Sequence, residues 1–146
     1  MASIQILLAD DDESDRMLFT DAFEELKLNT KIDMVHDGVA LLEYLDKKKN
    51  NLPQFLFLDL NMPLKDGKEC LDEIRNTLKL NEIIIAIFST SASEKDIEDT
   101  FVLGANVYIQ KPGDYTVLKE CLNRVVSHGG VYKDPPFQLK NFILRI

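Results

Sequence analysis

The sequence predicts a doubly wound α/β domain, in which helices cover both faces of a parallel β-sheet. Five short apolar runs recur along the chain, at residues 4–9, 31–35, 55–58, 83–88 and 107–110. All but the second are nearly continuous, which is typical of strands buried on both faces. The stretches between the runs have helical periodicity. This βα alternation, repeated five times, favours right-handed crossovers that place helices on both sides of the sheet.

Each element has its own local signal. In the second run, Ile32 and Met34 alternate with polar residues, which predicts an edge strand. Apolar residues at i, i+3, i+4 and i+7 mark two helices, through Phe19, Ala22, Phe23 and Leu26 and through Leu118, Cys121, Leu122 and Val125. Three more helices are marked by Leu41, Leu42 and Leu45, by Leu71, Ile74 and Leu78, and by Ile97 and Phe101. The last of these is expected to end near Gly104 as a C-cap.

The repeating pattern ends near Ser127, which predicts a domain over 1–127 and a C-terminal extension over 128–146. Gly129 and Gly130 are predicted to form a hinge. Beyond it, an apolar stripe at helical spacing is formed by Leu139, Phe142, Ile143 and Ile146. We expect this stripe to pack against the domain or a second copy. The extension is too short for an independent output domain.

Composition excludes several classes of partner. The net charge of −8 and a pI near 4.7 disfavour nucleic-acid binding, which normally uses a basic surface. The chain lacks a signal-peptide pattern and any apolar run long enough to span a membrane, so a cytoplasmic protein without membrane contact is expected. Cys70 and Cys121 lie in apolar helical patterns without zinc-ligand spacing and are predicted to be buried thiols.

Acidic residues follow two of the predicted strands. Asp10, Asp11 and Asp12 come directly after the first strand, and Asp59 comes after the third. For strand order 2-1-3-4-5, ligands bind at the carboxyl ends of strands 1 and 3, where the acids converge. Two carboxylates about 4 Å apart repel by roughly 4 kcal/mol at an effective dielectric near 20, so the cluster favours a cation. Hard oxygen ligands favour Mg²⁺, with Mn²⁺ as the alternative, while Asp12 is better explained as a helix N-cap.

Two further functional groups close the remaining strands of the predicted sheet. Ser89 ends the fourth strand and Lys111 ends the fifth. With the acids, they supply a carboxylate nucleophile, a metal site, a hydroxyl donor and a fixed cation, which together suit phosphoryl transfer. A Gly-rich phosphate loop follows none of the strands, so nucleotide hydrolysis is disfavoured.

Four segments carry a resemblance to the receiver domains of two-component signalling, the chemotaxis response-regulator type with a flavodoxin-like fold. They are Ile-Leu-Leu-Ala-Asp-Asp at 6–11, Phe-Leu-Asp-Leu-Asn-Met-Pro at 57–63, Phe-Ser-Thr at 88–90 and Tyr-Ile-Gln-Lys-Pro at 108–112. The resemblance covers about residues 4–127. Each segment ends a predicted strand, in the order that the receiver pattern requires.

The resemblance implies a role for each matching residue. Asp59 would be the phosphoacceptor, and the metal would be bound by Asp10, Asp11, Asp59 and the backbone carbonyl of Asn61. Ser89 and Lys111 would contact the phosphoryl oxygens, and Tyr108 matches the aromatic switch position. The Lys111–Pro112 bond would be cis. Met62, Pro63 and Gly67 are explained by turn and helix-entry geometry rather than chemistry.

The expected function is that of a phosphorylation-activated response regulator. A sensor histidine kinase or phosphotransfer protein would phosphorylate Asp59, and the acyl phosphate would change binding to a downstream protein. Dimerisation would use the extension or the face around the fourth and fifth strands. Such a domain catalyses its own phosphorylation and dephosphorylation without being a turnover enzyme. The competing hypotheses are a receiver that only binds and a phosphatase of haloacid-dehalogenase type, although Asn61 stands where the latter has a second acid.

Overall fold

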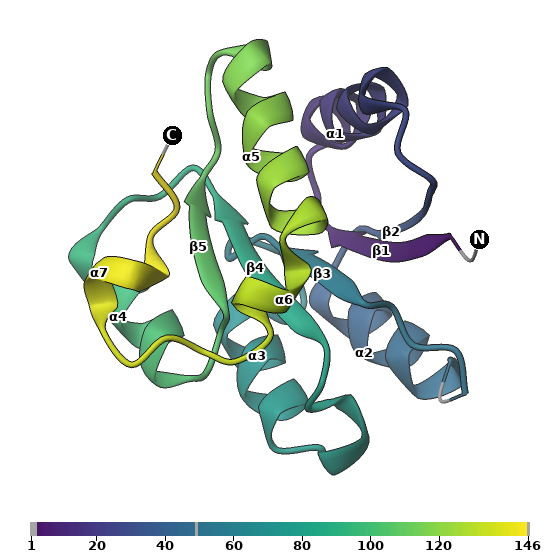
Figure 1. Ribbon diagram of the computed structural model, residues 1–146. Coiled ribbons are helices and arrows are strands. Elements are labelled where there is room, and N and C mark those ends of the chain that lie inside the picture. The colour runs from purple at the N-terminus through teal and green to yellow at the C-terminus, as the bar shows by residue number, and fades with distance from the viewer. Residues whose placement is uncertain (1–2, 49, 146) are drawn as a thin grey trace.

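The five predicted strands form one parallel sheet in the order β2-β1-β3-β4-β5 (Figure 1). The structure is a computed structural model that describes residues 3–48 and 50–145. The strands are β1 (Ile4–Ala9), β2 (Thr30–Val35), β3 (Phe55–Leu58), β4 (Ile84–Ser89) and β5 (Val107–Gln110). The predicted fold class and strand order are confirmed, and the strand boundaries differ from the predicted ones by at most one residue.

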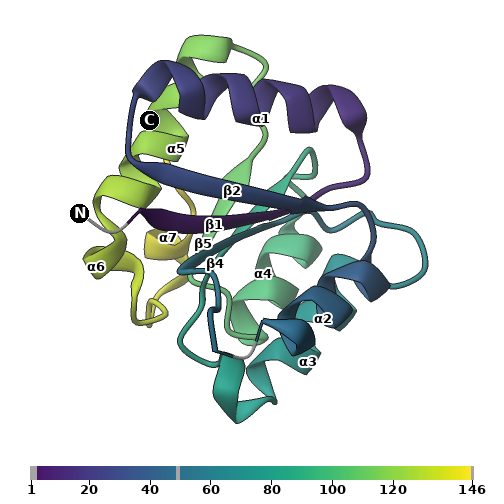
Figure 2. The ribbon, with the colours of Figure 1, turned by 90° about the vertical axis from the view of Figure 1, so that its right-hand side faces the viewer.

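Helices cover both faces of the sheet. Figure 2 shows α1 (Glu13–Leu26) and α5 (Tyr115–Ser127) on one side, with α2 (Gly38–Lys47), α3 (Gly67–Arg75) and α4 (Glu94–Val102) on the other. A separate apolar core lies on each face: Phe19, Phe57 and Leu122 belong to one, and Leu41, Leu58 and Ile74 to the other. The predicted extension of the third helix to Leu78 is wrong: α3 ends at Arg75, and Leu78 begins a separate 3₁₀ helix, η1 (Leu78–Leu80), where it is exposed.

Several local predictions hold at the ends of elements. β2 is an edge strand, and Met34 is exposed on it. Gly104 follows α4 with φ of +97°, a backbone conformation that glycine adopts without steric cost. Cys70 and Cys121 are free and buried. In the described part of the chain, no helix is both long and apolar enough to cross a membrane.

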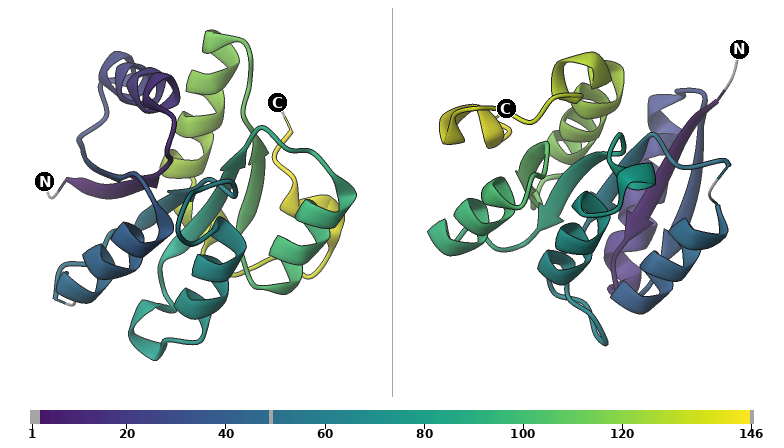
Figure 3. Two further views of the ribbon diagram at one scale, coloured as in Figure 1. Left: turned by 180° about the vertical axis from the view of Figure 1, so that it is seen from behind. Right: turned by 90° about the horizontal axis from the view of Figure 1, so that it is seen from below.

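The C-terminal extension packs against the domain, which is one of the two predicted alternatives, but its conformation differs from the prediction. It contains two single-turn helices, α6 (Gly129–Tyr132) and α7 (Leu139–Phe142), and continues extended past α7 (Figure 3). Phe142 is fully buried, whereas Leu139 and Ile143 are half-buried. The predicted continuous amphipathic helix is therefore wrong after Phe142, because Ile143 pairs with Tyr108 of β5 instead. Ile146 lies outside the described residues.

The predicted glycine hinge is also wrong. Gly129 and Gly130 begin α6, and Gly129 packs against the core: a Cβ atom at this position would lie 2.7 Å from Cζ of Phe55. Gly129 therefore permits close approach of the chain to β3 rather than rotation of the extension.

Candidate functional site

Three carboxylates meet at the carboxyl ends of β1 and β3. These strands are neighbours, and the Asp59 amide donates to Ala9 O at 3.0 Å, which brings Asp59 beside the residues that follow β1. One oxygen from each of Asp10, Asp11 and Asp59 lies within 4.8 Å of the others. Asp10 and Asp59 are buried and Asp11 is exposed. The cluster thus opens to solvent on the Asp11 side.

Lys111 provides the positive charge next to these acids. Its Nζ lies 2.8 Å from Asp10 Oδ2 and 3.2 Å from Asp59 Oδ2, and its side chain is only 9% exposed. Burial would lower the pKa of Lys111, but hydrogen bonds to Asp10 and Asp15 and the charge of Asp59 outweigh that effect and raise its pKa. Lys111 therefore remains protonated and holds a fixed positive charge at the site.

Asp15 is a site residue that the sequence analysis missed. Its Oδ2 accepts a hydrogen bond from Lys111 Nζ at 2.8 Å, from the first turn of α1. No local signal identified it, because an acidic residue in the first turn of a helix is already explained by the helix dipole. Its contact with Lys111 lies far outside what local spacing predicts.

The arrangement of oxygens suits a small divalent cation. Asp10 Oδ1 accepts from the Asp12 amide at 2.9 Å. The buried Asp10 Oδ2 has Lys111 Nζ as its ion-pair partner at 2.8 Å, and no other group among the described residues donates to it. A carboxylate oxygen with a single partner keeps a lone pair available for a cation. Together with hard oxygen atoms from Asp11 and Asp59, it fits the ligand set preferred by Mg²⁺ or Mn²⁺.

Asp59 is held in an unusual electrostatic environment. Burial raises its pKa to about 6; the charge of Lys111 opposes this rise and the charge of Asp10 adds to it. Its Oδ1 accepts a long hydrogen bond of 3.4 Å from the Asn61 amide. A carboxylate that accepts few hydrogen bonds retains free lone pairs for a cation or an electrophile.

The loop after Asp59 is held close to the site by tight backbone packing. The Gly67 amide donates to Leu60 O at 2.9 Å, and a Cβ at Gly67 would lie 2.3 Å from Asp59 O. Asp66 caps α3 through a capping box with Glu69. The structural explanation of Gly67 is confirmed.

At the start of α1, Asp12 accepts a hydrogen bond from the Asp15 amide at 2.9 Å, so its predicted N-cap role is also confirmed.

Ser89 and Tyr108 are connected through the loop that follows β4. The Ser89 hydroxyl is buried and accepts from the Ser91 amide at 3.2 Å. The Tyr108 hydroxyl in turn donates to Ser91 O at 2.9 Å. Burial raises the pKa of Tyr108, so the phenol stays protonated and able to donate. The ring is only 1% exposed and already lies inside the fold.

The predicted cis bond before Pro112 is wrong. Residues 3–48 and 50–145 contain no cis peptide, so the Lys111–Pro112 bond is trans, as most X–Pro bonds are. The Lys111 amide donates to Ser89 O at 2.7 Å and so extends the β4–β5 pairing by one residue. This pairing directs the lysine side chain to the acidic cluster without a cis bond.

A doubly wound sheet with three carboxylates, a buried serine and a largely covered lysine side chain at its carboxyl edge defines a receiver-type signalling domain. The family model for the response regulator receiver domain matches residues 6–123. The chain therefore belongs to the response regulator receiver family of two-component signalling.

Relatives and solved structures agree with this assignment. The chain is 32% identical to the probable methanogenesis regulatory protein FilR2 of Methanothrix harundinacea, over 84% of this chain and 81% of that protein. It is 30% identical to response regulator Rcp1 of Synechocystis sp., over 73% of this chain and 75% of that protein. The crystal structure of the phosphorylated cyanobacterial phytochrome response regulator RcpA superposes with a TM-score of 0.80 at 30% identity, covering 88% of this chain and 96% of that one.

Proposed function

We propose that Asp59 accepts a phosphoryl group from a histidine kinase or phosphotransfer protein in a Mg²⁺-dependent reaction, and that this modification changes binding to a downstream protein. The observation that carries the proposal is the meeting of buried Asp59 with Asp10, Asp11 and Lys111 in one crevice. This set combines a nucleophile, further oxygen ligands and a fixed cation. Phosphoryl transfer depends mainly on such positioning and charge stabilisation.

In the proposed step, a carboxylate oxygen of Asp59 attacks the phosphorus of a phosphohistidine. The oxygen–phosphorus bond forms as the nitrogen–phosphorus bond breaks, and the electron pair stays on the imidazole of the donor, which then takes up a proton. Lys111, which lies 3.2 Å from Asp59 Oδ2, would neutralise charge on the phosphoryl oxygens. The buried Ser89 hydroxyl would donate a hydrogen bond to one of them.

The metal would be held by the carboxylates of Asp10, Asp11 and Asp59 and by the backbone carbonyl of Asn61. When bound, Mg²⁺ supplies Lewis-acid stabilisation of the negative charge that develops during transfer. A solved structure of response regulator Rcp1, 27% identical to this chain with a TM-score of 0.77, is a Mn²⁺-bound form, which supports binding of a divalent cation. Mg²⁺ is proposed because small, hard cations suit carboxylate and carbonyl oxygen.

A phosphorylation assay tests the proposal directly. Incubation with a small acyl-phosphate donor and Mg²⁺ is expected to add the mass of one phosphoryl group, detected by intact-mass spectrometry. The same reaction with a chelator should leave the mass unchanged, because uncompensated negative charge at the site would repel the donor. An adduct that forms equally well with the chelator would contradict a metal-dependent mechanism.

We also expect Ser89→Ala to separate phosphorylation from its structural response. The variant keeps Asp59 and Lys111 and should still accept the phosphoryl group. It loses the hydroxyl that links the site to the Ser91 loop and hence to Tyr108. Because the Tyr108 ring is already buried, the expected wild-type response is a change in its hydrogen bond to Ser91 rather than the opening of new space.

NMR of labelled Tyr108, recorded with and without a phosphoryl mimic, measures this response. The wild-type signal should shift, and the Ser89→Ala signal should not. Ser127→Ala is the control, because the Ser127 hydroxyl donates to Asn123 on α5, away from the Ser91 loop. An unchanged wild-type signal would contradict the coupling of Tyr108 to the site.

A further inference from the structure

The free edge of β5 is covered by the chain's own C-terminal residues. Ile143 forms a parallel bridge with Tyr108, and the Leu144 amide donates to Tyr108 O at 2.9 Å. Figures 1 and 3 show this segment running beside β5 and next to α4. A strand edge presents unpaired backbone groups that favour pairing with another segment. Here residues 143–144 satisfy part of that edge.

One aromatic side chain anchors the segment. Phe142 is fully buried, with its ring centroid 5.4 Å from that of Phe101 on α4 and 6.0 Å from that of Tyr108 on β5. Phe137, five residues earlier, is fully exposed. The burial of Phe142 is therefore specific to its place between α4 and β5 and is not a general property of aromatic residues in the extension.

The remaining contacts of the segment involve half-buried side chains: Leu139 and Leu144 pack against the two apolar cores. Arg124 on α5 donates to Arg145 O at 2.6 Å, while Ile143 and Leu144 are only half-buried. Further back, the Asn106 side chain fixes the chain by donating to Tyr132 O at 2.7 Å and to Lys133 O at 3.2 Å. Between these two attachments, residues 134–138 are mostly exposed. A tethered segment with one fully buried side chain and otherwise half-buried or exposed residues is typical of regions that open locally without global unfolding.

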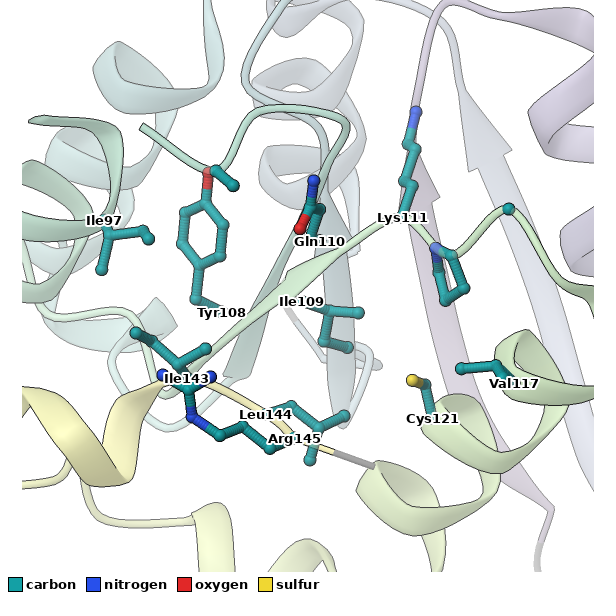
Figure 4. A pocket seen from close by; sticks show the side chains of 13 residues that line it. Ile97, Tyr108, Ile109, Gln110, Lys111, Val117, Cys121, Ile143, Leu144 and Arg145 are labelled. Atoms are coloured by element: carbon teal, nitrogen blue, oxygen red, sulfur yellow. The ribbon is translucent and has the colours of Figure 1, made fainter. Parts of the chain in front are cut away.

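The docked segment does not fill the surface. A cavity of about 620 Å³ is bounded on one side by Ile143, Leu144 and Arg145 and on the other by β5 and its continuation to Pro112 (Figure 4). Lys111 lines this cavity, and its Nζ reaches Asp59. Lys111 therefore connects this cavity to the phosphoacceptor site.

We propose that β5 and α4 form a strand-addition site for an extended segment of a partner protein, and that residues 139–145 are its built-in, displaceable ligand. The docked segment shows what the site accepts: backbone pairing with Tyr108 and an aromatic side chain between Phe101 and Tyr108. In strand addition, main-chain hydrogen bonds supply affinity and side-chain pockets supply selectivity. The inference concerns the chain itself and stands whether or not Asp59 is phosphorylated.

Charge narrows the chemistry of the partner. Residues 139–145 carry Lys140 and Arg145 and contain no acidic residue, whereas the whole chain has a net charge of −8. Helix α4, which contacts the docked segment through Phe101, carries four acidic residues and one lysine. Complementary charge favours encounter with a basic segment. The expected partner therefore presents an apolar, basic stretch with one aromatic residue.

A labelled peptide of residues 138–145 tests the proposal against the full-length chain by fluorescence anisotropy. In the wild type, the tethered copy competes and the peptide should bind weakly. Phe142→Ala should release the tethered copy and tighten binding at least about tenfold, because apparent affinity scales with the fraction of open sites. Phe137→Ala is the matched control and should bind as the wild type does, since Phe137 contacts no part of the site.

Hydrogen exchange provides the second measurement. Residues 107–110 and 143–145 should exchange faster in Phe142→Ala, while β1 and β3 remain protected. Should that variant lose its native circular dichroism, Leu144→Pro replaces it, because proline removes the amide that donates to Tyr108 O. Equal peptide affinity in the wild type, Phe137→Ala and the variant that releases the tail (Phe142→Ala or Leu144→Pro) would overturn the proposal. Absence of peptide binding to the variant that releases the tail would overturn it as well.

Discussion

Replacing Asp59 with Asn is expected to abolish phosphoryl acceptance completely while leaving the fold intact. The amide is nearly isosteric with the carboxylate but is a far weaker nucleophile. Intact-mass spectrometry with a small acyl-phosphate donor and Mg²⁺ measures the loss. Asp12→Asn is the matched control, since asparagine also caps helices well and Asp12 serves α1 as its N-cap. Persistence of the adduct in Asp59→Asn would show that another residue is the acceptor.

The same substitution is expected to stabilise the protein when metal is absent. The pKa of Asp59 is raised to about 6 in the fold from a reference value of 3.8. The folded state therefore binds an extra proton between these values, and stability falls as the pH rises through about 6. At pH 7.5 the charged carboxylate costs on the order of 2 kcal/mol, which Asn removes. Below the unfolded-state pKa, both states are protonated and the gain should vanish.

Urea unfolding in the presence of a chelator, at pH 7.5 and at pH 3.5, measures this difference. The free energy of unfolding of Asp59→Asn should exceed that of the wild type only at the higher pH. Added Mg²⁺ should reduce the difference at pH 7.5, because the cation offsets the repulsion between Asp59 and Asp10. An equal gain at both pH values would contradict an electrostatic origin.

The second large effect is expected from Asp11→Ala, which should weaken Mg²⁺ binding by about 100-fold, as loss of a charged ligand removes both an oxygen and a negative charge. Asp12→Ala should weaken it far less. Asp11 contributes an oxygen to the cluster with Asp10 and Asp59, whereas Asp12 accepts a hydrogen bond from the Asp15 amide. Calorimetric titration of both variants measures the two affinities.

The free energy of unfolding should rank the two variants in the opposite order to Mg²⁺ affinity, with Asp12→Ala the more strongly affected. Asp12→Ala removes an N-cap and should lower the free energy of unfolding by about 1 kcal/mol. Asp11→Ala leaves the cap in place and, without metal, relieves repulsion within the cluster. Equal losses of Mg²⁺ affinity would mean that the acidic pair is displaced by one residue from Asp10 and Asp11.

The sequence alone determined the fold class and the convergence of the acidic residues. Continuous apolar runs and helical periods are local properties, and each follows from the repeat distance of the backbone. Asp12 as a cap and Gly104 as a helix terminator were likewise readable, because capping depends on residues only a few positions apart. Asp10 and Asp59 could be placed together because parallel strands present their carboxyl ends at one edge.

Only the tertiary structure decided which groups make contact over long separations. Lys111 meets Asp15 across 96 residues, a pairing that no local pattern encodes. Gly129 proved to be a packed position against Phe55, and Lys111 reaches the cluster from a trans bond. The stripe in the extension predicted burial of Phe142 but not its location. Ile143 pairs with the free edge of β5 instead of continuing the helix. This pairing satisfies backbone N–H and C=O groups of β5 that would stay unpaired if the helix continued.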